Sequence, residues 1–176
     1  MSCDLEPTRS PGPHYRGDIF DVIDAPWDLA VFHPPCTHLS VSGARHFAAK
    51  RMDGRQQSAV SFFMALVRRS AHIPRCAFEQ PVSVIASAWR PADQTIQPWM
   101  FGHFETKATC FWLRGLPPLV PVYRCIAECA EALGLSRDAK PADRVHKMPP
   151  GPNRARDRSA TFSGIATAIA EQWGMV

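Results

Sequence analysis

The stretch DLAVFHPPCT, residues 28–37, decides the expected fold. Asp28–Phe32 is a short apolar run that stops at two prolines, a pattern typical of a buried parallel strand whose carboxyl end opens into a loop. Cys36 would then stand just beyond the end of that strand. Because reactive groups in open α/β sheets lie beyond the carboxyl ends of strands, Cys36 is the first candidate site residue.

Outward from this stretch, strand and helix patterns alternate. Gln56–Arg69 has apolar residues at helical spacing and ends in two arginines, which predicts a buried helix. Arg75–Phe78 and Ala108–Leu113 predict further strands, and Ser159–Trp173, followed by Gly174, predicts a C-terminal helix over the sheet. The expected fold is α/β, with three layers and helices on both faces of the sheet.

The composition fits one domain spanning residues 1–176. Hydrophobic residues make up 45% of the chain and charged residues 20%, enough for a core and against general disorder. Residues 122–157 are rich in proline and arginine and predict a loop region.

No apolar run reaches the ~18 residues of a bilayer span, and the N-terminus lacks signal-peptide features, so we expect a cytoplasmic protein without a membrane partner. Six cysteines without a C-x-x-C predict reduced thiols.

The basic residues are concentrated late in the chain. A net charge of +4 permits contact with phosphates but also suits many proteins that never bind them. Arg154, Arg156 and Arg158 form a basic run, which is either a solvated loop or a phosphate clamp beside a cleft. The sequence leaves both interpretations open.

Glu79 follows the strand predicted at Arg75–Phe78, so it and Cys36 stand at two strand ends. A thiol near a carboxyl group and cations supports nucleophilic catalysis, because the thiolate needs a lowered pKa and the acid can protonate the group under attack. The alternative is a buried cysteine and a solvated glutamate. A metal site is not expected, since the spacing of Cys36, His33, His38 and His46 fits no standard zinc pattern.

The residues around Cys36 resemble the nucleophile motif of the cytosine-C5 DNA methyltransferases. In that family a strand runs into a Pro-Cys dipeptide followed by small and hydroxyl residues, as here in Pro35-Cys36 and then Thr37, Ser40, Ser42 and Gly43. The resemblance implies a Rossmann-like methyltransferase sheet with Cys36 as the covalent nucleophile. It also implies that Pro35 contacts the cofactor and that Ser40 and Ser42 contact nucleic acid.

Two later segments extend the resemblance. Phe78-Glu79-Gln80-Pro81 stands where the family has Glu-Asn-Val, which implies that Glu79 holds and protonates the cytosine ring, although Gln80 and Pro81 depart from the pattern. Gly102–Thr109 resembles the family's Gln-x-Arg-x-Arg motif, which implies a catalytic cation at Lys107. Thr109 replaces a second cation of that motif.

The cofactor implied by the resemblance is S-adenosylmethionine. Asp18 resembles the aspartate that binds its adenine amino group, and Asp4 resembles the acid that holds its ribose hydroxyls. No glycine-rich F-x-G-x-G loop precedes Asp4, so we expect an N-terminally truncated fold with half of the cofactor pocket missing. Residues 122–151 replace the family's target-recognition domain, which predicts poor sequence specificity, with Arg154, Arg156 and Arg158 gripping phosphates.

Two functions follow as expectations. In the first, Cys36 adds to C6 of cytosine in DNA or a nucleotide, Glu79 is the acid, and the methyl group comes from S-adenosylmethionine. In the second, the chain is an inactive binding module for nucleic acid or a protein, such as an accessory, decoy or anti-defence factor. An exposed sheet edge would favour a homodimer or a covering partner. Short phage-encoded relatives of the family share the PPCT, QPW-x-FGH and MPPGP blocks, which implies a bacterial or phage-infected host cell.

Overall fold

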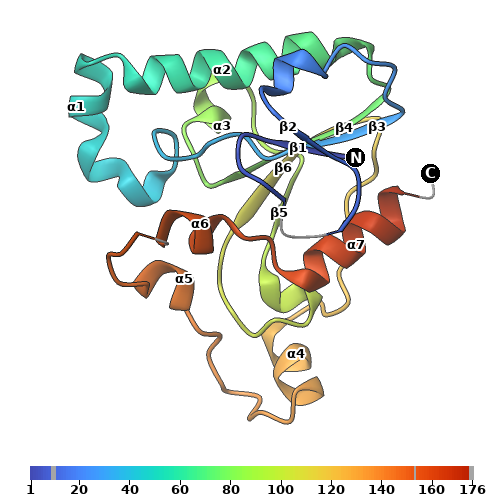
Figure 1. Ribbon diagram of the computed structural model, residues 1–176. Coiled ribbons are helices and arrows are strands. Elements are labelled where there is room, and N and C mark those ends of the chain that lie inside the picture. The colour runs from blue at the N-terminus through green and yellow to red at the C-terminus, as the bar shows by residue number, and fades with distance from the viewer. Residues whose placement is uncertain (9–10, 153, 175–176) are drawn as a thin grey trace.

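A four-stranded mixed sheet lies at the centre of the protein in the computed structural model, which describes residues 1–8, 11–152 and 154–174 (Figure 1). The strands lie in the order β3 (Leu29–Phe32), β4 (Arg75–Pro81), β6 (Thr109–Arg114) and β5 (Gln94–Ile96). β3 and β4 are parallel, whereas β6 runs antiparallel to both of its neighbours. A separate parallel pair is formed by β1 (Ser2–Asp4) and β2 (His14–Arg16).

Helices of very different lengths surround this sheet. The two long ones are α2 (Arg55–Arg69) and α7 (Ser163–Trp173). The short α-helices are α1 (Phe47–Met52), α3 (Ile85–Ala88), α4 (Ile126–Ala132), α5 (Arg144–Lys147) and α6 (Arg154–Ser159). The 3-10 turns are η1 (Ile19–Asp21), η2 (Val41–His46), η3 (Ser70–His72) and η4 (Pro98–Phe101). Thus α4, α5 and the start of α6 lie within residues 122–157, the predicted loop region.

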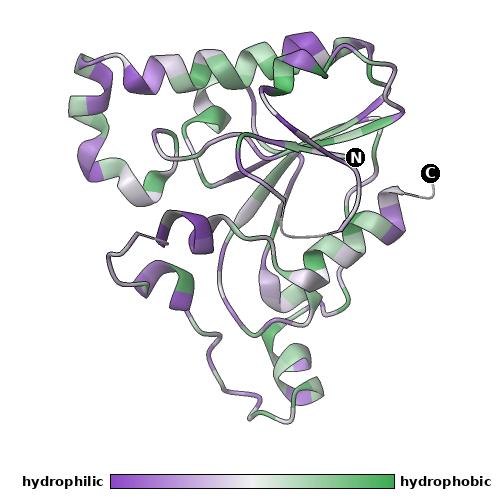
Figure 2. Ribbon diagram, viewed as in Figure 1, coloured by the Kyte–Doolittle hydropathy of each residue, from purple (hydrophilic) through white to green (hydrophobic). Residues whose placement is uncertain are grey.

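The core is divided into two hydrophobic clusters, one on each face of the sheet. Alternate β4 side chains separate them, because Phe78 belongs to the cluster under α2 and Ala77 to the cluster under α7. Phe63 of α2 and Trp173 of α7 are fully buried and anchor the two helices. Figure 2 shows α7 as mostly hydrophobic and α6 as hydrophilic, in keeping with their places at the core and at the surface.

The α/β class and the main elements are confirmed, with three differences. β4 extends to Pro81, so Glu79 lies inside a strand rather than after it. The simple alternation of strands and helices is wrong for β5 and β6, because a 3-10 turn, η4, joins them and the chain returns antiparallel. The C-terminal helix begins at Ser163 and not at Ser159. At this observed start, the Gly164 N–H donates to Nε2 of His103 (2.9 Å).

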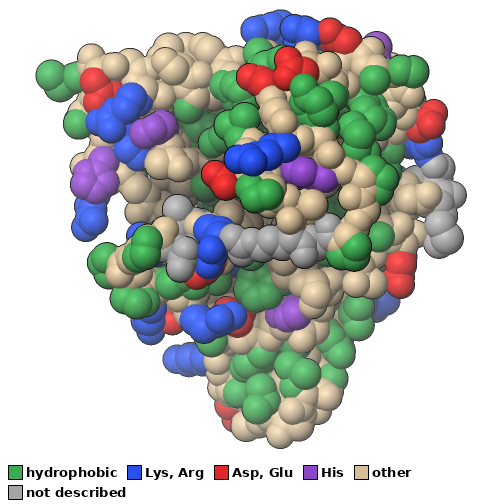
Figure 3. Space-filling model, in the orientation of Figure 1, with side chains coloured by type: hydrophobic (Ala, Val, Ile, Leu, Met, Phe, Trp, Pro, Cys, Tyr) green, Lys and Arg blue, Asp and Glu red, His purple; other side chains and the backbone are tan. Residues whose placement is uncertain are grey.

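β3 forms one edge of the four-stranded sheet, since among the described strands it pairs only with β4. Figure 3 shows hydrophobic side chains at the end of the molecule that carries α4, where Ile126, Leu133 and Leu135 are exposed. In the described part of the chain, no helix combines the length and the apolar character that a membrane span requires.

Candidate active site

Cys36 lies in the loop that leaves β3, residues 33–40, which we call the Cys36 loop. Pro34 is buried and Cys36 is half-buried, so the loop runs along the protein and does not project from it. The carbonyl oxygen of Cys36 accepts hydrogen bonds from the backbone N–H groups of Leu39 and Ser40, both at 3.0 Å. These two bonds close a tight turn immediately after the cysteine.

Glu79 reaches the same end of the sheet from β4. The parallel register pairs Phe32 with Phe78, so the next residues of the two chains, His33 and Glu79, come side by side. His33 Nδ1 lies 3.2 Å from Oε2 of Glu79, and only 18% of the glutamate side chain is exposed. From the sequence, we considered His33 only as a possible metal ligand. Its contact with Glu79 was not predicted, because the contact depends on the register between β3 and β4.

Lys107 arrives at this end because β6 runs in the opposite direction. β6 begins at Thr109, which pairs with Pro81, so the residues just before β6 lie where β4 ends. The Lys107 N–H donates to Oε1 of Gln97 (3.0 Å), and its ammonium donates to the carbonyl oxygen of Ala160 (2.9 Å). Gln97 therefore holds the backbone of Lys107 in place.

Glu79 and Lys107 line one small cleft, and the charges of both act on the ionisation of Cys36. Burial and the Glu79 carboxylate raise the pKa of the Cys36 thiol, whereas the nearby Lys107 and Arg158 act to lower it. Burial lowers the pKa of Lys107, partly opposed by the negative charges of Glu79 and Cys36. A thiol, a carboxylate and two cations are therefore close enough for each charge to affect the ionisation of Cys36.

The basic run of residues 154–158 divides into separate roles. Arg158 is half-buried and acts on both Cys36 and Lys107. Arg154 instead donates from Nε to the carbonyl oxygen of Met148 (2.7 Å), and Arg156 pairs with Asp157 (3.0 Å). Of the three predicted phosphate-binding arginines, the structure brings Arg158 to the site.

A small cleft lies between this end of the sheet and the start of α7. Its polar lining comes from His33, Glu79, Lys107, Thr109 and Thr161, and its apolar lining from Phe111, Phe162, Ile165 and Ile169. The ammonium of Lys107 lies 6.0 Å from the centroid of the Phe162 ring. Cys36 stands beside the cleft, coupled to its charged residues. The cleft encloses about 10 Å³, room for about one water molecule, with a carboxylate, a cation and an aromatic ring in its lining.

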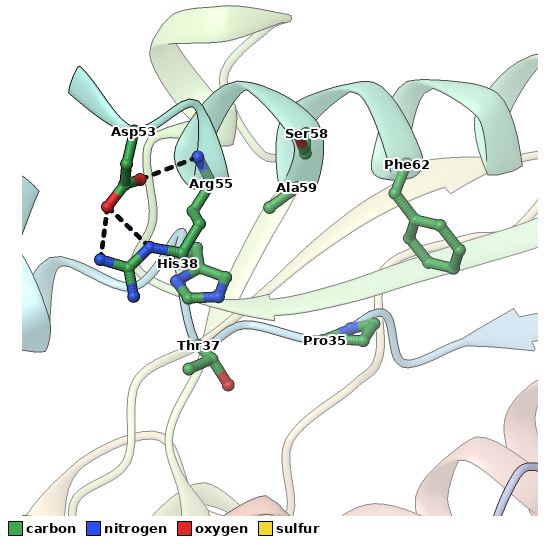
Figure 4. Close-up of a pocket in the computed structure, with 8 residues that line it drawn as sticks. All are labelled: Pro35, Thr37, His38, Asp53, Arg55, Ser58, Ala59 and Phe62. Carbon is green, nitrogen blue, oxygen red and sulfur yellow. Dashed lines mark hydrogen bonds and ion pairs between the residues drawn. The ribbon is translucent and has the colours of Figure 1, made fainter. Parts of the chain in front are cut away.

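A second, larger pocket of about 370 Å³ lies between the Cys36 loop and α2 (Figure 4). Pro35, Ala59 and Phe62 supply apolar surface, and the polar residues are Thr37, His38, Asp53, Arg55 and Ser58. Nε of Arg55 donates to Asp53 Oδ2 (2.8 Å). The buried Nδ1 of His38 has no hydrogen-bond partner among the described residues. Pro35 and Thr37 flank Cys36, so the larger pocket and the small cleft adjoin the same short stretch of chain.

The predicted cofactor acids lie near one another but carry local contacts. Asp4 and Asp18 are both exposed, and both act on Cys3, whose thiol pKa is raised by burial and by these carboxylates. Asp4 Oδ1 accepts the N–H of Glu6 (2.9 Å), and Asp18 Oδ1 accepts the N–H of Phe20 (3.0 Å), capping η1. Neither acid is among the described residues that line the larger pocket.

η1 nevertheless adjoins that pocket. The ring of Phe20, two residues after Asp18, packs edge-on against the pocket residue Phe62, with the centroids 5.6 Å apart. Pro35 thus lines the pocket, Asp18 lies on the neighbouring element, and Asp4 lies further along the β1–β2 pair.

Ser40 and Ser42 shape the backbone after the Cys36 loop. Ser40 caps η2, since its Oγ accepts the N–H of Ser42 at 3.4 Å, and the two hydroxyls are 2.9 Å apart. Ser40 also forms a backbone bridge with Ser83. The pair therefore has a structural role whether or not it meets nucleic acid.

Three polar residues that the sequence analysis missed bind the Cys36 loop directly: Lys50, Gln56 and Gln80. For Gln80 the sequence offered one weak signal, a polar residue within a strand-like segment. For Lys50 and Gln56 it offered none.

All six cysteines are described and free. Among the described residues, no three His, Cys, Asp or Glu side chains come together as candidate metal ligands.

Comparison with known proteins adds no relative: no family model, no curated protein and no solved structure matches this chain.

Proposed function

We propose that this protein acts on a pyrimidine base of nucleic acid in the manner of a cytosine-C5 DNA methyltransferase, with Cys36 as the nucleophile and Glu79 as the acid. The observation that carries the proposal is the convergence of four charged or ionisable groups from separate segments: Cys36 after β3, Glu79 in β4, Lys107 before β6 and Arg158 in α6. Nucleophile, acid and cations are the groups that addition to an electron-poor ring requires.

The charge balance of the site favours a proton transfer coupled to attack. The Cys36 thiol is the resting form, because burial and the Glu79 carboxylate both raise its pKa. When the thiol proton passes to Glu79, the negative charge moves to sulfur and the net charge of the site is unchanged. Glu79 then donates this proton to the ring nitrogen as the sulfur–C6 bond forms, and the C5–C6 double-bond electrons make C5 nucleophilic. Lys107 and Arg158 stabilise the negative charge throughout.

The cations also suit the substrate's backbone. Arg158 is half-buried and pairs with no acid among the described residues, so its guanidinium is available for a phosphate. Contacts of this kind position a strand without reading its sequence. Enzymes that do chemistry on a base take it out of the stack, so the target base has to be unpaired or flipped out of a duplex. Single-stranded DNA is therefore the preferred first substrate.

The 370 Å³ pocket is the proposed place of S-adenosylmethionine, which would supply an electrophilic methyl group for C5. Its lining fits an adenosyl group, because Pro35 and Phe62 offer flat apolar surface and the unpartnered Nδ1 of His38 and the hydroxyls of Thr37 and Ser58 offer polar contacts. Asp18 would approach from η1. The exposed Asp4 has no place in this arrangement, so we propose no role for it.

The fold agrees with this proposal in its general plan. One long helix packs on each face of the mixed sheet, and both sites lie at the carboxyl ends of the parallel strands β3 and β4. This is where ligands bind in open α/β sheets. We therefore propose a three-layer, Rossmann-like methyltransferase fold, and a cytoplasmic setting in a bacterial or phage-infected cell.

Two experiments test the two halves of the proposal separately. Cytosine carrying tritium at C5 should lose the label to water in single-stranded DNA without any cofactor, because addition of Cys36 to C6 opens C5 to exchange. Cys36→Ser should abolish the release, and Cys125→Ser, a change at an exposed cysteine, should leave it intact. Label that stays in place with the wild-type protein would refute Cys36 as the nucleophile.

The methyl-transfer half depends on the larger pocket. With S-adenosylmethionine present, DNA containing 5-fluorocytosine should form a stable adduct at Cys36, since fluorine cannot leave C5 as a proton does. Titration calorimetry should detect cofactor binding that Phe62→Ala weakens. Tritium release without adduct formation or cofactor binding would retain the addition chemistry and reject methyl transfer.

A second candidate function is binding without turnover. It is favoured by the raised pKa of Cys36 and by the local hydrogen bonds of Asp4 and Asp18, which leave neither acid lining a cofactor pocket. The open edge of β3 would then accept a protein partner or a second copy of the chain. Tight binding of single-stranded DNA that Cys36→Ser does not change, together with no tritium release, would support this candidate.

A further inference from the structure

Three side chains from three elements hold carbonyl groups of the Cys36 loop. Gln80 of β4 donates from Nε2 to the Pro34 oxygen at 2.6 Å. Lys50 of α1 donates from Nζ to the Thr37 oxygen at 2.7 Å. Gln56 of α2 donates from Nε2 to the His38 oxygen at 3.4 Å. The bonded carbonyls lie on both sides of Cys36.

All three side chains are buried, so each polar group carries a desolvation cost that its hydrogen bonds have to offset. Gln80 is 0% exposed, Gln56 7% and Lys50 9%. Burying a long polar side chain is unfavourable unless hydrogen bonds compensate, and a buried ammonium is the most costly of the three. Six buried polar or charged side chains occur among the described residues, and three of them bind this one loop. Their convergence is therefore a feature of the loop and not of the core in general.

Backbone contacts fix the far end of the loop as well. The Val84 N–H donates to the Leu39 oxygen (3.1 Å), and just beyond the loop the Val41 N–H donates to the Val82 oxygen (2.9 Å). Together with the turn bonds to the Cys36 oxygen, these contacts leave the loop few free backbone acceptors. A segment tied in this way opens only when several bonds break.

We infer that Gln80, Lys50 and Gln56 are positioning residues that keep the Cys36 loop closed, so that the sulfur faces Glu79 and Lys107 before any ligand binds. A reacting group held by packed and hydrogen-bonded neighbours is preorganised, because no loop closure is needed when the substrate arrives. The inference concerns the same cysteine as the proposed function, but it makes a statement about the free protein alone.

Thiol labelling of the full chain tests this directly. Cys36 is half-buried, so iodoacetamide should label it faster when the loop opens, whereas the exposed Cys125 reports the intrinsic rate in the same molecule. Mass spectrometry of peptides gives both rates, together with those of the buried Cys76 and Cys129, which report unfolding of the core. No nucleic acid or cofactor is needed, so the result is independent of the proposed chemistry.

Matched substitutions separate the loop contacts from general effects. Lys50→Met is compared with Arg51→Met, and Gln56→Leu with Gln57→Leu, since each pair joins a buried residue with its exposed neighbour. Gln80→Leu completes the set. Lys50→Met and Gln80→Leu should raise the labelling of Cys36 relative to Cys125 about 10-fold, the order expected when one strong hydrogen bond to the closed state is lost. Gln56→Leu should act in the same direction but less, because its bond is longer.

The outcomes decide the inference in either direction. Faster labelling of Cys36, with Cys76 and Cys129 still protected and the exposed-site controls unchanged, supports it. Unchanged labelling of Cys36 in Lys50→Met and Gln80→Leu overturns it. If Cys36, Cys76 and Cys129 become reactive together in every buried-site variant, the three residues stabilise the whole core and have no specific role at the loop, which also overturns it.

Discussion

Arg114 at the end of β6 ties the sheet to α2, and its replacement by methionine should destabilise the protein strongly. Its guanidinium donates to the backbone oxygens of Val67, Ser70 and Ile73 and to the Ser70 hydroxyl. These oxygens belong to Val67 in the last turn of α2, to Ser70 in the η3 turn and to Ile73 just after that turn. The guanidinium also lies 5.9 Å from the centroid of the Phe78 ring.

The size of the effect follows from these contacts. Methionine retains most of the apolar stem but removes every donor, so the carbonyl oxygens of Val67, Ser70 and Ile73 lose one hydrogen bond each. Each hydrogen bond from a charged donor contributes roughly 1.5–3 kcal/mol, but bonds that share one group are not additive. Interaction with the helix dipole adds about 0.3–1 kcal/mol. We expect Arg114→Met to lower the free energy of unfolding by about 3 kcal/mol, and the melting temperature by about 6–12 °C for a chain of this size.

Urea denaturation followed by circular dichroism measures the change, with Arg68→Met as the control. Arg68 lies on the same helix end but is exposed, so its replacement should cost less than about 1 kcal/mol. Equal losses in the two variants, or a loss below about 1 kcal/mol for Arg114→Met, would show that the contacts at the end of α2 contribute little. Because α2 forms one wall of the larger pocket, the variant should also bind S-adenosylmethionine more weakly if that cofactor occupies the pocket.

Three further predictions concern the site and the core. Glu79→Gln removes a charge that raises the pKa of Cys36, so the pH profile of iodoacetamide labelling should shift to lower pH, while tritium release is lost. Lys107→Met removes a charge that lowers this pKa, so the same profile should shift to higher pH; identical profiles for the two variants would contradict the assigned coupling. Phe63→Ala removes a fully buried ring whose centroid lies 5.7 Å from that of Trp112. It should lower the free energy of unfolding, measured by urea denaturation, by about 3–5 kcal/mol.

The local patterns predicted β3, β4, β6 and α2 because each pattern reports burial of that segment alone. The direction of β6 has no such signature, since an apolar strand looks alike in parallel and antiparallel pairs. That direction matters for the site, because it is what brings Lys107 to the end of β4. The family resemblance named Lys107, but only the sheet topology explains how it reaches Glu79.

The residues of the candidate site likewise divide into those that the sequence reveals and those that it does not. Cys36 and Glu79 could be found because strand-like segments are visible in the sequence and the carboxyl ends of a parallel pair converge, although Glu79 lies within β4 and not after it. Arg158 could not be separated from Arg154 and Arg156, because Arg154 and Arg158 are four residues apart and share a helix face, and the contact of Arg154 with the Met148 carbonyl leaves no trace in the sequence. Gln80 was missed because its partner is a backbone oxygen 46 residues away, and sequence patterns do not encode such pairings.

The Cys36 loop contributes residues to both cavities, and this has a thermodynamic consequence. His33 lines the smaller cleft, and Pro35, Thr37 and His38 line the larger pocket. A ligand that displaces this stretch from one side changes the affinity for a ligand on the other. Linkage then requires the reverse effect to be equal in size, so the two occupants of the protein would bind with a reciprocal coupling free energy.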